Sequence, residues 1–131
     1  MSAIDLHHVH IFASDMKATL AWWQHHLGAR ILIDADMAGS RNVLIGVGSG
    51  RINIYDQPPR GAGRGGPVHH VGVRVKNLRE TWQRLQAEGL TSPGGLREHA
   101  GWRYVMIAAP DGLLVELFEF DDPGHPINID G

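Results

Sequence analysis

Histidine is the residue type that stands out in this sequence. Nine of the 131 residues are His, and a His-His-Val triplet occurs twice, beginning at positions 7 and 69. Successive side chains of a strand point to opposite faces, so the valine of each triplet and the imidazole before it lie on opposite sides. We therefore expect His8 and His70 to share a polar face, and we expect His7 and His69 to be structural.

A carboxylate occupies an apolar segment further along the chain. Glu116 interrupts the run Leu113–Phe118, which predicts a strand buried on both faces. A carboxylate buried there needs a cation or strong hydrogen-bond donors. Arg74 or Arg103 would satisfy Glu116 alone, whereas a divalent metal would explain the carboxylate together with both histidines. The predicted metal ligands are His8, His70 and Glu116.

Imidazole and carboxylate ligands together suit a limited set of metals. We expect one divalent ion, with Fe or Mn as the first choice and Ni, Co or Zn as alternatives. Cysteine is absent, so thiolate ligands, disulfides and cysteine nucleophiles are excluded.

The chain repeats one unit with an offset of 62 residues. The two triplets align, Asp15 falls on Asn77, and Leu20 falls on Trp82. Each copy begins with an alternating strand, continues with apolar residues at helical intervals and ends in short apolar runs separated by turns. The predicted class is therefore α+β, built from two copies of a strand–helix–three-strand unit.

Helix ends and strands can be placed approximately. Asp15 and Asn77 are suitable N-caps, and Gly28 and Gly89 stand where the helices end. The expected strands after the helices are 29–34, 42–46 and 51–56 in the first copy, an unclear segment after residue 90, then 102–108 and 113–120 in the second copy. The predicted boundaries within one domain are 4–57 for the first copy, 58–67 for a Gly/Pro-rich linker, 68–120 for the second copy and 121–131 for an irregular tail.

Bulk properties exclude several classes of partner. The formal net charge is −2 and the cationic residues are scattered, so we expect no nucleic-acid partner. No apolar run approaches the roughly 20 residues that span a bilayer, and the start does not resemble a signal peptide. A cytoplasmic protein without a membrane partner is expected.

The motifs resemble those of the vicinal oxygen chelate superfamily, which includes glyoxalase I, epimerases, extradiol dioxygenases and fosfomycin-resistance enzymes. The resemblance rests on Leu6–Val9, Val68–Val71 and Pro110–Leu117, and it extends from about Ile4 to Phe120. It implies two βαβββ modules whose curved mixed sheets form a cup around a metal. It also implies a homodimer and the ligand set of two histidines and Glu116 given above. Trp22, which lies off the helical apolar stripe, is a candidate dimer contact.

The resemblance leaves one ligand position in doubt. Family members often supply a fourth ligand from the last strand of the first module, and Asn53 aligns with that position. Asn is a weak ligand, so Asn53 is expected to bind substrate or a metal-bound water. This departure counts against a glyoxalase I with four protein ligands.

The favoured reaction is that of an extradiol-type dioxygenase. Two histidines and one carboxylate leave metal positions open for a small substrate that chelates through oxygens, and for O2. Candidate catalytic residues are His10, His99 and Tyr104. Candidate substrate-binding residues, besides Asn53, are Arg74, Trp102 and Met106.

Two other functions remain open from the sequence. A glyoxalase- or epimerase-type lyase or isomerase would use the metal to polarise a carbonyl while a side chain moves a proton. An antibiotic-modifying or ligand-sequestering resistance protein is the other alternative, and a sequestering protein would not need the metal ligands.

Overall fold

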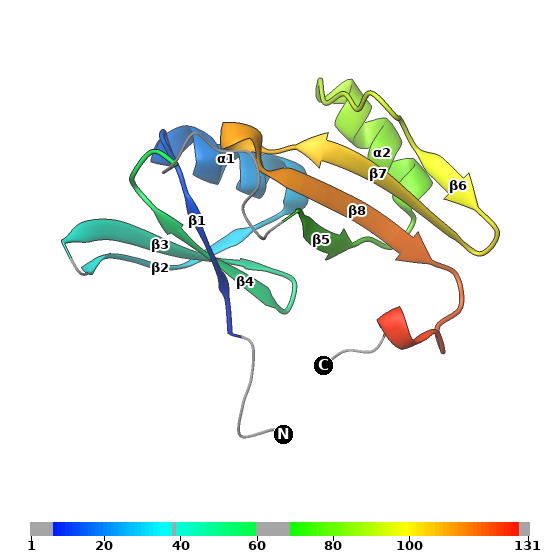
Figure 1. Cartoon of the computed structure of the whole chain (residues 1–131), viewed down its shortest axis with the longest axis horizontal. Helices are drawn as coiled ribbons and strands as arrows, with labels where there is room; N and C mark the ends of the chain where they lie inside the picture. The colour runs from blue at the N-terminus through cyan, green and yellow to red at the C-terminus, as the bar shows by residue number, and fades with distance from the viewer. Residues whose placement is uncertain (1–6, 38, 60–68, 129–131) are drawn as a thin grey trace. The chain divides into compact units, whose positions relative to one another are not determined.

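The computed structural model describes residues 7–37, 39–59 and 69–128 (Figure 1). The chain divides into two compact units, Met1–Arg64 and Gly65–Gly131, and each unit holds one module. Most of the linker expected at 58–67 lies outside the described residues, as do the last three residues of the tail. No helix in the described ranges is long and apolar enough to cross a membrane.

The first unit is a four-stranded mixed sheet with one helix. Its elements are β1 (Val9–Phe12), α1 (Met16–Leu27), β2 (Arg30–Met37), β3 (Ser40–Val47) and β4 (Gly50–Tyr55). The strand order is β1-β4-β3-β2. The first strand pairs in parallel with the last, and the other two pairings are antiparallel.

The second unit repeats this arrangement. Its elements are β5 (Val71–Arg74), α2 (Leu78–Ala87), β6 (Arg97–His99), β7 (Trp102–Ala108) and β8 (Leu114–Phe120). The strand order is β5-β8-β7-β6, again with the first strand parallel to the last. Short 3-10 turns, Pro110–Gly112 and Pro126–Asn128, precede and follow β8. The repeated topology confirms the prediction of two βαβββ modules in the α+β class.

Each sheet buries one face. The registers place the buried aliphatic strand residues of each unit on a single side, and these residues are Val43, Ile45, Ile52 and Ile54 in the first unit and Val105, Ile107, Val115 and Leu117 in the second. Trp23 and Trp82, both expected in the core, are 0% and 6% exposed. Trp22 is half-buried, with its ring centroid 5.3 Å from that of Trp23.

The expectation that β8 is buried on both faces was wrong. Val115 and Leu117 are fully buried, but Leu114 is 38% exposed and the Glu116 side chain is 26% exposed. In the part of this unit that the structure describes, the α-helix α2 packs on β7 and β8, on the side of their buried aliphatic residues. The opposite face, which carries Glu116, is therefore partly open.

The two helices begin in different ways. The Asp15 carboxylate accepts a hydrogen bond from the Ala18 amide at 3.0 Å, which confirms it as the N-cap of α1. Asn77 precedes α2 as expected, but its backbone is left-handed (φ 58°) and its side chain makes no capping bond. The carboxylate of Glu119 on β8 instead accepts bonds from the amides of Asn77 and Leu78, at 2.8 and 3.1 Å.

Glu119 also belongs to an ionic network centred on a buried guanidinium. Arg103, whose side chain is 5% exposed, donates to Glu119 at 2.8 Å and to both oxygens of Asp121 at 2.9 and 2.8 Å. Burial alone would raise the pKa of Glu119, but the two backbone amides and Arg103 together hold it below its usual value of 4.5. The network ties the start of α2 to β7 and β8.

Replacing Glu119 tests how much this network contributes to stability. We expect Glu119→Gln to lower the free energy of unfolding by about 2 kcal/mol, because the buried Arg103 and the α2 amides lose a charged acceptor. Urea unfolding at pH 7 measures the change. The control is Glu80→Gln, which removes an exposed carboxylate from the first turn of the same helix and should cost no more than about 0.5 kcal/mol.

The same pair of variants gives a pH test. Because the folded-state pKa of Glu119 is lowered, its contribution is full at neutral pH and is lost as the pH falls through that folded-state value. The stability gap between the native chain and Glu119→Gln should therefore shrink below about pH 4.5. A gap that stayed constant into strong acid would contradict the role given to this carboxylate.

Candidate functional site

The parallel pairing of β5 with β8 brings an imidazole and a carboxylate together. Gly72 lies beside Glu116 in the register, so His70, two residues before Gly72, is on the same face of the sheet. His70 Nε2 lies 3.8 Å from Glu116 Oε1, and both side chains are partly exposed. Arg103 faces the other side with Glu119, so it is not the cation that accompanies Glu116.

In each His-His-Val triplet, the ring of the first histidine contacts the ring of the second. His69 Nδ1 lies 2.8 Å from His70 Nδ1, with the ring planes at 83°, and His7 Nδ1 lies 3.0 Å from His8 Nδ1, with the planes at 88°. This contact uses Nδ1 of His8 and of His70 and leaves the Nε2 atom of each ring to bind a ligand. The expectation that His7 and His69 are only structural missed this contact.

The first unit places two further candidate residues on one face. His10 and Asn53 are neighbours in the β1–β4 register. The His10 ring centroid lies 3.7 Å from that of Tyr55, and burial, followed by the charge of His8, lowers the pKa of His10. Asn53 Nδ2 donates to Asn42 Oδ1 at 3.2 Å, while the buried Asn53 Oδ1 has no hydrogen-bond partner among the described residues.

The second unit places the other candidates on the face that carries Glu116. Met106 lies opposite Glu116 in the β7–β8 register, Tyr104 lies opposite Phe118, and Trp102 lies opposite Phe120. These side chains alternate with fully buried neighbours along β7, which matches the predicted alternation.

A row of stacked rings extends along this face. His99 stacks on Trp102 at 4.5 Å, Trp102 stacks on Phe120 at 5.1 Å, and Phe120 stacks on His125 at 4.5 Å. The interplanar angles are 20°, 10° and 28°. The sequence analysis missed Phe120 and His125. Alternation along β8 could have identified Phe120, but no local signal in the tail indicates His125.

The predicted site residues are divided between the two units. The first unit contains His8, His10 and Asn53, and the second contains His70, Arg74, His99, Trp102, Tyr104, Met106 and Glu116. Within the second unit, the structure brings together two of the three predicted metal ligands, His70 and Glu116.

Comparison with known proteins identifies the family. Residues 5–117 match the model of the Glyoxalase/Bleomycin resistance protein/Dioxygenase superfamily. The chain belongs to this superfamily. The chain is also 27% identical over 126 residues to the uncharacterized protein YwkD of Bacillus subtilis (strain 168), covering 87% of this chain and 95% of YwkD.

Several solved structures of the superfamily resemble this chain. A glyoxalase family protein from Enterococcus faecalis is 26% identical, with a TM-score of 0.73, and the match covers 91% of this chain and 100% of that one. TnmS3, an antibiotic binding protein from Streptomyces sp. CB03234, is 20% identical at a TM-score of 0.73, covering 92% and 99%. FosX, a fosfomycin resistance protein from Listeria monocytogenes complexed with Mn(II) and sulfate, is 17% identical at a TM-score of 0.69, covering 91% and 93%. The last two show a shared fold.

The donor atoms of the second module fit a divalent ion. Metal bonds to imidazole nitrogen and carboxylate oxygen are each about 2.1 Å long, so two such ligands on one ion lie no more than about 4.2 Å apart. The observed separation of 3.8 Å is within that limit. A ligating histidine commonly donates its other ring N–H to a neighbour, and His69 is in place to accept it from His70.

Metal affinity distinguishes the two kinds of histidine. We expect His70→Ala and Glu116→Ala to lose binding of Mn2+ and Ni2+ in calorimetric titrations, since each removes a donor atom. His69→Ala should weaken binding by roughly 10- to 100-fold, because it removes only the group that orients His70. The control is His125→Ala, which should bind normally. A folded His70→Ala variant with full metal occupancy would refute the assignment.

Proposed function

We propose that this protein is a divalent-metal-dependent enzyme in which His8, His70 and Glu116 hold the ion, and that it is an extradiol-type dioxygenase. The main support is the 3.8 Å approach of His70 Nε2, just before β5, to Glu116 Oε1 on β8, the parallel neighbour of β5. The same histidine contact occurs at His8 in the other module, where His7 engages Nδ1. On this proposal, each of the two modules supplies one of the two imidazoles.

The ligand set favours a metal with open positions. Asn53 uses its amide nitrogen to bind Asn42, which leaves only a weak amide oxygen as a fourth donor. A bound divalent ion would supply a Lewis acid able to orient two adjacent substrate oxygens. Fe or Mn fits this proposal best, with Ni, Co or Zn as alternatives.

The chain's own side chains would orient the substrate. Tyr104 is one step along the open face from Met106, which lies opposite Glu116, so we assign its hydroxyl as the donor to a substrate oxygen. His99 stacks on Trp102 further along and lines the site. His10 lies two residues beyond His8 and beside Asn53 in the β1–β4 register, and we assign it as the candidate proton acceptor.

The row of stacked rings supports an aromatic substrate. The half-buried Trp102 and Phe120, stacked within this row, offer a planar ligand an apolar aromatic wall. A catechol meets both requirements, because it is planar and carries two adjacent oxygens. We therefore take a small catechol as the substrate class.

The same rings support a second candidate function. A protein that sequesters a planar antibiotic would need the aromatic surface but not a reactive metal. The family description includes bleomycin resistance proteins, and TnmS3 is an antibiotic binding protein of the same fold. This alternative differs from the first because binding should survive removal of the metal donors.

Oxygen uptake tests the proposal. Protein loaded with Fe(II) without oxygen should, on addition of air and a catechol, consume one O2 per catechol opened, measured with an oxygen electrode and by absorbance. Tyr104→Phe should lower kcat by roughly 10-fold or more through loss of one hydrogen bond to the transition state. Trp22→Phe, a change in α1, is the control and should leave kcat unchanged.

The other outcomes each identify an alternative. Proton exchange on hemithioacetals or 2-oxo thioesters without oxygen uptake would replace the dioxygenase by a lyase or isomerase. Tight binding of planar compounds that is unchanged in Glu116→Ala, without turnover, would replace the enzyme by a sequestering protein.

A further inference from the structure

The second sheet ends at β6, a three-residue edge strand that carries an arginine on the open face. Arg97 lies opposite Tyr104 in the β6–β7 register. Tyr104 alternates with Met106 along β7, and Met106 lies opposite Glu116. Residues that lie opposite each other in a register share one face of the sheet. Arg97 is therefore on the same face as the carboxylate that we assign to the metal.

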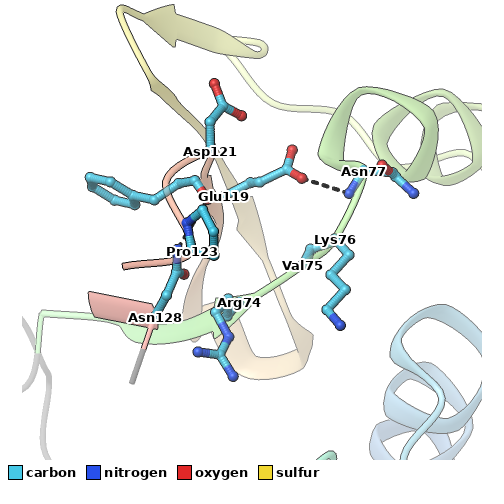
Figure 2. A pocket seen from close by; sticks show the side chains of 9 residues that line it. Arg74, Val75, Lys76, Asn77, Glu119, Asp121, Pro123 and Asn128 are labelled. Atoms are coloured by element: carbon cyan, nitrogen blue, oxygen red, sulfur yellow. Dashed lines mark hydrogen bonds between the residues drawn. The ribbon is translucent and has the colours of Figure 1, made fainter. Parts of the chain in front are cut away.

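The acidic residues around β6 are turned to the other face. Glu98, the next residue along β6, contacts Arg79 of α2, and its Oε1 lies 3.6 Å from Arg103 Nε. Glu119 on β8 directs its carboxylate at the amide of Asn77, where α2 begins (Figure 2). Both carboxylates belong to the α2 side of the sheet. The β6 end of the open face therefore carries a positive charge.

The opposite side of the sheet has no such bias. A pocket of about 470 Å3 lies where β5 and β8 end, and Figure 2 shows its lining. Two cationic and two acidic side chains line it, namely Arg74, Lys76, Glu119 and Asp121. Because charges of both signs are present, this pocket does not select the sign of a ligand's charge. The β6 end of the open face does.

A glycine makes room for the Arg97 side chain. A Cβ added at Gly94 would lie 2.9 Å from Arg97 Nη2 and 3.0 Å from Arg97 Nε. The guanidinium therefore lies against the bare backbone of this glycine, beside the edge strand. Within the described ranges it forms no ion pair. Its planar fork of N–H donors suits a carboxylate.

The surface between Arg97 and Glu116 is aromatic and apolar. Tyr104 and Met106 lie between them, and the Tyr104 ring stacks on Trp102 with the centroids 5.5 Å apart and the planes at 16°. The backbone positions of Arg97 and Glu116 are two strands and two residues apart, which corresponds to about 12 Å. That span suits one substituted ring bound between two long side chains.

We propose that Arg97 binds a carboxylate substituent on the ring of the substrate whose two oxygens chelate the metal. This inference rests on the proposed function for the identity of the bound molecule as substrate. The substrate class is thereby narrowed from a small catechol to a catechol that carries a carboxylate. Guanidinium and carboxylate match as a planar, two-point pair, so Arg97 is a specificity-determining residue.

Two simple probes test this role in metal-free protein. Benzoate and benzamide have nearly the same shape, but only benzoate is charged at pH 7. We expect benzoate to bind about tenfold more tightly than benzamide at low ionic strength. The indole N–H signal of Trp102 in 15N NMR titrations reports binding of both probes. Arg97→Gln should remove the preference, and Arg97→Lys should retain part of it.

The matched control is Arg30→Gln. Arg30 is an exposed arginine on β2, the edge strand of the first sheet, so the variant removes the same charge at a comparable position. It should leave the preference for benzoate unchanged. Four results would overturn the proposal: equal binding of the two probes, no saturation with benzoate, a preference that survives in Arg97→Gln, or an equal loss in Arg30→Gln.

Turnover gives a second readout and separates this inference from the proposed function. In iron-loaded protein, the ratio of kcat/KM for 3,4-dihydroxybenzoate to that for 3,4-dihydroxybenzamide should fall about tenfold in Arg97→Gln. A failed probe titration would leave the metal assignment of His70 and Glu116 intact, because that titration contains no metal. A preference for benzoate without oxygen uptake would keep the role of Arg97 and remove the dioxygenase.

Discussion

The parallel pairing between the first and last strands of each module determines where the candidate site residues lie. Parallel neighbours cannot be joined by a tight turn, so a helix and two strands intervene between β5 and β8. His70 and Glu116, 46 positions apart in the sequence, become neighbours only through this ladder. A slip of one residue would move Glu116 to the helix side and separate it from His70.

The two faces of the second sheet carry different kinds of residues. The side toward α2 holds the aliphatic core and, at its end, the network around Arg103. The open side holds His70, Glu116 and the aromatic row. The core and the proposed site therefore use alternate residues of the same strands.

Much of the architecture could be predicted because its signals are local or repeated. The alternation of side chains along Trp102–Ala108 predicted which residues lie on each face of β7. The repeat with an offset of 62 residues predicted the duplicated topology. The contact of His69 with His70, the place of Phe120 in a stacked row and the capping of α2 by Glu119 could not be predicted. The His69–His70 contact depends on the rotamers of two neighbouring side chains, and the other two depend on tertiary register. One sequence displays neither.

The two wrong expectations have the same origin. Asn77 looks like a cap because its residue type suits one, but β8 delivers a carboxylate to the same amides. The run around Glu116 looks doubly buried because it is apolar, yet α2 covers only one side. In both cases the local residue types suggested a structural role. The groups that lie nearby in the folded chain determined the actual role.

α2 is capped by Glu119, a residue of β8, and this affects when the cap can form during folding. α1 carries its acceptor at Asp15, three residues from the amide that it binds, so its first turn can close as soon as that segment collapses. α2 receives its carboxylate cap only when Glu119, 41 residues beyond Leu78, is in place, and hence only after the last strand of this module has paired. The cap of α2 therefore forms together with its sheet, whereas the cap of α1 can form ahead of its sheet.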